Sequence, residues 1–308
     1  MSAMLRALER DQRGIGLMAY ELFFANRPGV DSLTAETFND YFQSRPRYRV
    51  EGSHVAYRND DTGVQFSFEW LPQRPVADFA TIAAASLEFG RPHCFGLEAA
   101  PELDAFVKRF ELLTFDPQID GMGRDAFSID GFLRGWNRGN RSGLSAVVQY
   151  AKRGSHTLPS EMLCDIWRWN YGREAYQAQL GDGIFVPKIE LLSAEEQVVT
   201  AVHWTDGIPV MLPKVDTVLV VREHFAPWKI LGGRKADVAS VSWSDLEPQL
   251  RIYRVEREPW PHRVLQFDRT PEELELFLRK LPSLKQLPEM VAPELVLDRE
   301  LVDAAVTR

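Results

Sequence analysis

The chain has 308 residues, of which 45% are hydrophobic and 26% are charged, and its net charge is −8. These values are those of an ordinary globular chain that is long enough to bury a core and form two domains, so extensive disorder is excluded. The acidic balance argues against a general nucleic-acid binder and against docking on an anionic membrane, because both need a surplus of Lys and Arg.

Cysteine spacing and apolar runs bear on the compartment. The two cysteines, Cys94 and Cys164, lie far apart and form no Cys-x-x-Cys pair, so no disulfide framework is expected. Residues Met1 to Asp11 lack the apolar stretch of a signal peptide, and no apolar run approaches the roughly 18 residues of a membrane span. We therefore expect a cytoplasmic protein with reduced thiols.

Apolar and turn-forming residues predict strands and helices in the first part of the chain. Either Ser32 or Thr34 is placed to cap a short helix, Pro101 to open a second helix, and Asn59 to Gly63 to connect the two arms of a hairpin. The expected strands are Gly16 to Phe24, His54 to Tyr57, Val64 to Trp70, Ala80 to Phe89 and Leu112 to Phe115.

The second half of the chain repeats this mixture of elements. An aromatic helix is expected from Pro159 to about Gly181, and Thr270 with Pro271 and Glu273 predicts a later helix that Thr270 caps. Apolar runs between these helices predict strands at Ile184 to Leu192, Val198 to Trp204 and Val215 to Val221.

The order of elements predicts an α+β fold with two domains, each a mainly antiparallel or mixed sheet with packed helices. Residues 1–118 form the expected N-terminal domain, and residues 183–308 form the C-terminal domain with a Pro-rich tail. Residues 119–182 form the expected connection, which is rich in Gly and Arg and contains the aromatic helices.

No catalytic or metal-binding signature stands out, so no cofactor and no metal are expected. The six histidines are scattered, and His203 and Asp206 lie near a turn without a nucleophile motif beside them. The alternative is an enzyme, a hydrolase or transferase, with its active site between the domains. His93, Cys94, Arg134 and Arg138 would then have to converge on one concave pocket.

The most unusual segment is Phe132 to Arg141, which concentrates Arg, Asn and Trp in an acidic chain. Arg and Trp are enriched at binding hot spots, and arginine forks suit carboxylate or phosphate groups. Gly135 and Gly139 predict a bent backbone or a close approach, since glycine weakens a helix. The competing interpretation is a structural polar cluster. The predicted binding residues are Arg134, Trp136, Asn137, Arg138 and Asn140.

A third possibility is an adaptor that uses the aromatic helix. Trp167, Trp169 and Tyr171 could anchor a partner, but aromatic residues in helices more often pack in a core. We favour core packing for these three side chains.

Several strings together give the chain a resemblance to bacterial proteins that act as immunity partners of secreted antibacterial toxins. The resemblance implies a cytoplasmic protein that binds and neutralises one toxin, and it transfers no catalytic residue. The sequence therefore predicts a non-enzymatic protein-binding protein with a protein partner and no nucleic-acid or membrane partner. The strings are Tyr20 to Phe24, Asn59 to Phe68, Phe132 to Asn140, and Lys214 to Asp216 leading into Val218 to Arg222.

Overall fold

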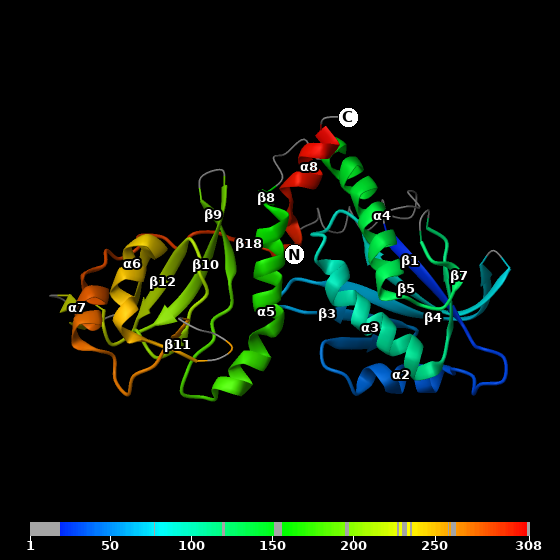
Figure 1. Ribbon diagram of the computed structural model, residues 1–308, viewed down its shortest axis with the longest axis horizontal. Helices are drawn as coiled ribbons and strands as arrows, with labels where there is room; N and C mark the ends of the chain where they lie inside the picture. The colour runs from blue at the N-terminus through cyan, green and yellow to red at the C-terminus, as the bar shows by residue number, and fades with distance from the viewer. Residues whose placement is uncertain are drawn as a thin grey trace. The chain divides into compact units, whose positions relative to one another are not determined.

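The computed structural model describes residues 19–76, 78–118, 121–150, 156–194, 197–226, 228–229, 233–234, 236–257, 259 and 263–306. The backbone divides into two compact units, one of Met1–Ser160 with Glu294–Arg308 and one of Glu161–Pro293. Both combine helices with antiparallel or mixed sheets, which confirms the α+β class (Figure 1). The domain boundaries predicted at residues 118 and 182 stay a prediction. The two compact units instead change over after Ser160 and after Pro293. The segment Met1 to Asp11 lies outside the described residues.

Unit 1, as we call the first of these, is built on a seven-stranded sheet in the order β2-β3-β4-β5-β1-β6-β7, with antiparallel neighbours throughout. Alternate residues of each strand point to one face, and on β1 the even-numbered Tyr20, Leu22 and Phe24 are buried. The strands are β1 (Ala19–Ala25), β2 (Tyr48–Glu51), β3 (His54–Arg58), β4 (Gln65–Val76), β5 (Phe79–Glu88), β6 (Leu113–Asp116) and β7 (Gly123–Asp125).

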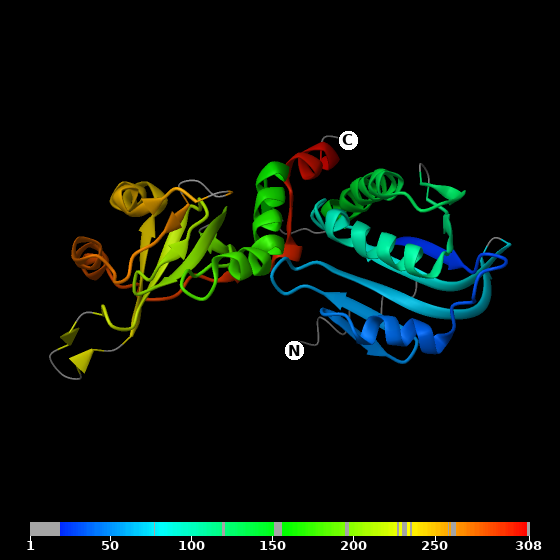
Figure 2. The same ribbon diagram turned by 60° about the horizontal axis from the view of Figure 1, so that its bottom comes forward.

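Three helices cover that buried face: α2 (Ala35–Gln43), α3 (Phe95–Phe110) and α4 (Ile129–Tyr150). Figure 2 shows α3 and α4 on the same side of the sheet. Phe42 of α2 and Phe106 of α3 both pack on Phe68 of β4, with ring centroids 4.7 Å and 5.0 Å apart. The predicted hairpin and the strand predicted at Ala80 to Phe89 are confirmed. The Thr34 cap is also confirmed, because the Thr34 hydroxyl accepts the Thr37 N–H.

The C-terminal segment returns to unit 1 after the chain has passed through unit 2. Strand β19 (Val296–Asp298) pairs in parallel with β8 (His156–Leu158), and α8 (Arg299–Val306) follows it. The Glu300 carboxylate accepts hydrogen bonds from both the N–H and the hydroxyl of Ser160. Unit 1 is therefore assembled from two segments that are far apart in the sequence.

Unit 2 has a five-stranded sheet in the order β15-β12-β10-β9-β18, in which only the β10–β12 pair is parallel. A smaller sheet, β11-β17-β16, and three helices complete its main architecture. The bounds are α5 (Ser160–Leu180), β9 (Glu190–Ala194), β10 (Gln197–Thr205), β11 (Val210–Met211), β12 (Thr217–Arg222), β15 (Asp237–Ser242), α6 (Trp243–Leu250), β16 (Arg254–Val255), β17 (Val264–Leu265), α7 (Glu272–Lys280) and β18 (Met290–Val291).

Two predicted helix starts are wrong. Helix α3 begins at Phe95, six residues before Pro101, so the proline lies inside the helix rather than at its first turn. Helix α7 begins at Glu272 with Pro271 at the N-cap position, so the proline precedes the helix instead of opening it, and Thr270 does not cap it. The Thr270 hydroxyl instead donates to the carbonyls of Asp206 and Gly207, because this turn lies against it. None of the helices in the described part of the chain is long and apolar enough to cross a membrane.

Candidate functional site

The exposed side of α4 carries the positive residues that the sequence singled out. Arg134, Asn137, Arg138 and Arg141 are all exposed, and their spacing of three, four and seven residues puts them on one face of the helix. We call these four residues the arginine row. A helix rises about 1.5 Å per residue, so the row extends over about 10 Å.

The other two predicted binding residues, Trp136 and Asn140, face the protein interior. Both side chains have an exposed fraction of 0%, so neither can touch a partner. The Trp136 indole N–H donates to the carbonyl of His93 over 3.2 Å, and its ring stacks on Phe89 with centroids 5.7 Å apart. The predicted surface therefore separates into an exposed row and a buried pair.

Asn140 holds the chain that leads from β5 into α3. Its carbonyl oxygen accepts the N–H of Gly90 over 2.8 Å and that of Arg91 over 3.3 Å, and its amide donates back to the Arg91 carbonyl. All three groups belong to Gly90 and Arg91, which lie in a turn outside the strands and helices. Asn140 thus satisfies backbone groups that would otherwise be costly to bury.

The glycines of α4 allow the helix to lie unusually close to the sheet. A Cβ atom on Gly135 would come within 2.5 Å of the Tyr20 hydroxyl, and one on Gly139 within 2.6 Å of the Phe89 ring. The helix is continuous from Ile129 to Tyr150, so close approach is the reason for these glycines. These contacts pack the inner face of the helix that carries the arginine row closely against the protein.

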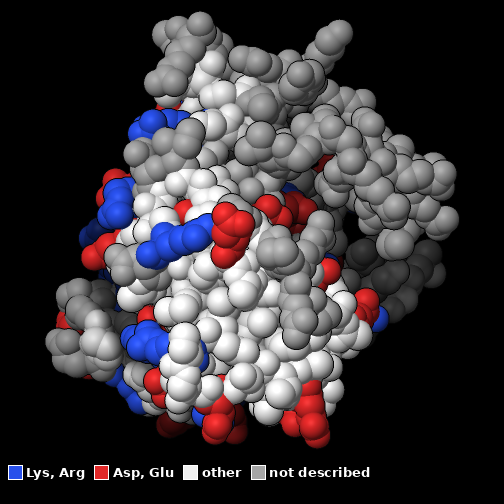
Figure 3. All heavy atoms as spheres, turned by 90° about the vertical axis from the view of Figure 1, so that its right-hand side faces the viewer, with Lys and Arg blue, Asp and Glu red and all other residues white. Residues whose placement is uncertain are grey.

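The charged surroundings of the arginine row differ from one arginine to the next. Burial raises the pKa of Tyr20 far above its ordinary value, its hydrogen bond to Asp116 raises it further, and the nearby charge of Arg134 opposes this. Among the residues that the structure describes, neither Arg134 nor Arg141 takes part in an ion pair. On the face in Figure 3, Lys and Arg atoms lie beside Asp and Glu atoms.

The four residues of the enzymatic alternative have different environments. Cys94 is 3% exposed, whereas Arg134 and Arg138 lie on the outer face of α4. His93 is bound to the buried Asp298 through its ring Nδ1, and its backbone N–H donates to the same carboxylate over 2.9 Å. The structure therefore gives His93 a structural partner that is 205 residues away in the sequence.

The aromatic helix α5 uses its side chains for packing. Trp169 is 5% exposed and its indole N–H donates to the Pro187 carbonyl over 2.8 Å, while Asn170 exchanges two hydrogen bonds with the backbone of Ile189. Trp167 and Tyr171 lie closer to solvent and stack on each other, with centroids 5.4 Å apart. Core packing is therefore confirmed for Trp169, whereas it is wrong for Tyr171, which is 37% exposed.

One group in the described part of the chain has the composition of a metal site. Asp206, Glu223 and His224 offer ligand atoms within 4.8 Å of one another. The Asp206 carboxylate already accepts the backbone N–H groups of Glu223, His224 and Phe225 and binds the His224 ring at 2.7 Å. The carboxylate therefore serves as the acceptor that closes the turn after β12.

His203 and Asp206, which lie three residues apart near a turn, bind different partners, Glu190 and His224. Burial pushes the pKa of the Asp206 carboxyl upward, but hydrogen bonds from the His224 ring and from three backbone N–H groups outweigh it and lower the pKa. His203 of β10 lies 3.0 Å from Glu190 of β9, and the interaction with this carboxylate raises the pKa of His203 above its ordinary value.

The His203–Glu190 pair predicts a specific pH dependence of stability. A raised pKa in the folded state means that the stabilisation is complete below the ordinary pKa of about 6.5 and is lost as the pH rises through the folded value. Urea unfolding between pH 6 and 8 should therefore show a decline that His203→Gln removes. Glu190→Gln should remove the same decline, and a variant that keeps it would show that another group titrates.

No family model, no curated protein and no solved structure matches the chain.

Proposed function

We propose that the chain is a non-enzymatic protein-binding protein of the kind that neutralises a bacterial toxin, and that the arginine row contacts its partner. The observation that carries the proposal is a set of exposed arginines on a helix whose opposite side is locked by Trp136 and Asn140. Arginines held on a rigid backbone lose less entropy on binding than arginines on a loop, which favours affinity.

The charges suggest what kind of partner fits. A net charge of −8 attracts a basic partner at long range and raises the rate of encounter. At short range, Arg134 and Arg138 present planar forks that bind a carboxylate with two hydrogen bonds. We therefore propose a partner that is basic overall and docks an acidic segment on the arginine row.

The size of the arginine row fits one part of an interface. A stable interface buries about 800 Å² on each partner, more than a helix face about 10 Å long can provide. The row then acts as the energetic centre, and neighbouring elements of unit 1 supply the surrounding contact. The resemblance to toxin-immunity proteins supports a toxin as that partner, with neutralisation in the cytoplasm.

The test is a binding measurement with the product of the neighbouring gene as candidate toxin. Arg134→Ala with Arg138→Ala should raise the dissociation constant by about 30-fold, the effect of losing a hot spot of about 2 kcal/mol. The melting temperature should change little, because both side chains are exposed. Cells that make the candidate toxin should lose protection with this double variant.

A charge-matched control separates the arginine row from the general field of the protein. Arg109→Ala with Arg168→Ala removes two exposed arginines from α3 and α5, so the net charge changes equally. This control should bind like the original protein. If no complex forms and no protection is seen, the proposed function is wrong; if the double variant binds normally, the arginine row is not the contact.

A further inference from the structure

A separate cavity lies wholly within unit 2, between α6 and the small sheet β11-β17-β16. It is open to solvent and has a volume of about 190 Å³. Its apolar lining comes from Leu212, Leu250 and Leu265, all of which are buried. None of these residues belongs to the arginine row, so the proposed function assigns no role to this cavity.

The elements around the cavity hold it in a fixed shape. Leu265 of β17 lies opposite Val210 of β11 on one side and opposite Arg254 of β16 on the other. The N–H of Leu212 donates to the carbonyl of Arg263 over 3.0 Å, which ties the next segment to β17. The part of the cavity floor that Leu265 forms is thus built on paired backbone.

Helix α6 forms the facing wall. Trp243, Glu247 and Leu250 line the cavity, and their spacing of four and seven residues places them on one face of the helix. The hydroxyl of Ser242 accepts the Asp245 N–H, and the Trp243 N–H donates to the Asp216 carbonyl over 3.1 Å. These bonds fix the start of α6 and with it the backbone that carries Trp243.

The charged lining is predominantly positive, although the chain is acidic. Lys214, Arg254 and Arg263 face a single acid, Glu247. Arg254 lies 3.5 Å from the Glu247 carboxylate, so this pair offsets one positive charge. Lys214 and Arg263 take part in no ion pair within the described ranges of the chain. Two cations therefore remain beside an apolar floor and an indole.

We infer that this cavity binds a small organic carboxylate with an apolar body. Arg263 and Lys214 supply the donors for the carboxylate, and the fork of an arginine matches its two oxygens. Trp243 and the three leucines supply the surface for an aromatic or branched body. The volume lies below the range of about 300–1,000 Å³ that drug-sized ligands occupy, which limits the ligand to a small molecule.

Calorimetric titration of the full chain with phenylacetate tests this inference. Phenylacetate should bind, whereas phenylacetamide, which has the same shape without the charge, should bind at least about tenfold more weakly, as expected when a hydrogen bond to a charged group is lost. Inorganic phosphate, which has charge without an apolar body, should be similarly weak. The two comparisons separate the role of the cations from that of the apolar lining.

Variants of the exposed cations locate the binding. Lys214→Gln and Arg263→Gln should each weaken phenylacetate binding by about tenfold. Arg251→Gln removes the same charge from an exposed arginine outside the lining and should leave binding unchanged. Normal melting temperatures in all three show that the fold is intact.

Three results would overturn the inference: no binding of phenylacetate at millimolar concentration, equal binding of phenylacetamide or phosphate, or unchanged binding in both Gln variants. None of these results bears on the arginine row, which belongs to unit 1 and is tested with a protein partner. A failure of one proposal is therefore distinguishable from a failure of the other.

Discussion

Replacement of Arg222 by methionine is expected to lower the free energy of unfolding of unit 2 by about 3–5 kcal/mol, the usual cost of removing one partner from a buried ion pair. Arg222 ends β12, and its side chain has an exposed fraction of 0%. Methionine fills a similar volume, so the loss comes from the polar groups that arginine leaves behind. Chemical unfolding monitored by circular dichroism measures it.

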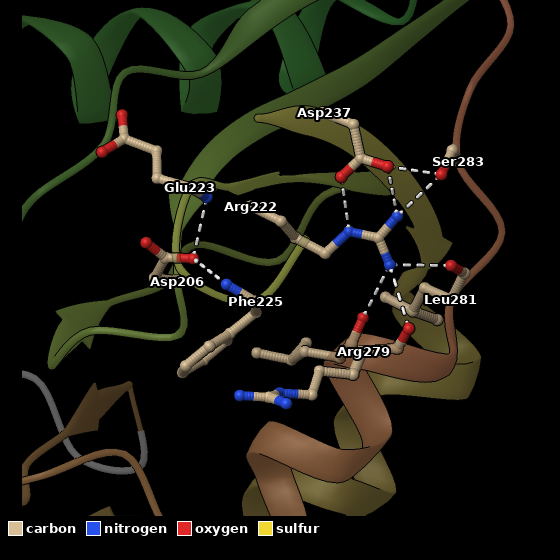
Figure 4. Close-up of polar contacts among 9 residues, drawn as sticks. Asp206, Arg222, Glu223, Phe225, Asp237, Arg279, Leu281 and Ser283 are labelled. Atoms are coloured by element: carbon tan, nitrogen blue, oxygen red, sulfur yellow. Dashed lines mark hydrogen bonds and ion pairs between the residues drawn. The ribbon is translucent and has the colours of Figure 1, made fainter. Parts of the chain in front are cut away.

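The geometry around Arg222 explains why the effect is large (Figure 4). Its Nε and Nη2 atoms bind the two oxygens of Asp237 on β15 at 2.9 Å and 2.8 Å. Its Nη1 donates to the carbonyls of Leu278, Arg279 and Leu281 at the end of α7. The guanidinium therefore neutralises a carboxylate and satisfies the carbonyl end of a helix at the same time.

Lysine cannot perform both tasks, because an ammonium group is a point charge without a fork. Arg222→Lys should therefore recover only part of the lost stability. Arg251→Met, at an exposed position of the same unit, should change stability by no more than about 0.5 kcal/mol. A loss below about 1 kcal/mol in Arg222→Met would show that the contacts of α7 with the sheet do not depend on this side chain.

Much of the fold follows from signals that act within a few residues. The turn from Asn59 to Gly63 lies between two strands, as its residue types predict, and Gly63 has the positive φ of 78° that suits glycine. Gly181 ends α5 with a φ of 75°, again as predicted. These signals need no knowledge of the rest of the chain.

Helix starts were harder to predict where tertiary contacts override the local signal. The residues before Pro101 are Phe95 to Ala100, and five of these six residues are buried, which places this turn against the core. The helix therefore extends over them despite the later proline. Thr270 has the right spacing for a cap, but the carbonyls of Asp206 and Gly207 compete for its hydroxyl. That competition involves residues more than 60 positions away and leaves no local trace.

The candidate site was predicted only in part, for a similar reason. The composition of Phe132 to Arg141 identified an unusual segment, but not which residues face outward. Helical spacing could have separated Trp136 and Asn140 from Arg134, Asn137 and Arg138, had the segment been assigned to a helix. The Asp298 partner of His93 and the cavity beside α6 depend on pairings that only the folded chain brings together.

The second large effect is expected from Trp136→Ala, which should lower the free energy of unfolding of unit 1 by about 3–5 kcal/mol. The ring packs between Phe89 and Tyr20, and Gly96 of α3 lies against it so closely that a Cβ atom there would come within 2.3 Å of the indole. Removing the ring leaves a cavity between α3, α4 and β1 and leaves the His93 carbonyl without its donor.

Two further variants separate these contributions. Trp136→Phe keeps most of the apolar contact but loses the hydrogen bond to His93, so it should be less destabilising than Trp136→Ala. Gly96→Ala leaves Trp136 in place but forces a methyl group into the ring, which should cost about 1–3 kcal/mol through overpacking. Asn137→Ala, at the exposed position beside Trp136, is the control and should leave stability within about 0.5 kcal/mol. Trp136→Ala and Asn137→Ala could instead unfold at the same denaturant concentration. That result would show that the indole does not hold α4 to α3 and does not fix the backbone that carries the arginine row.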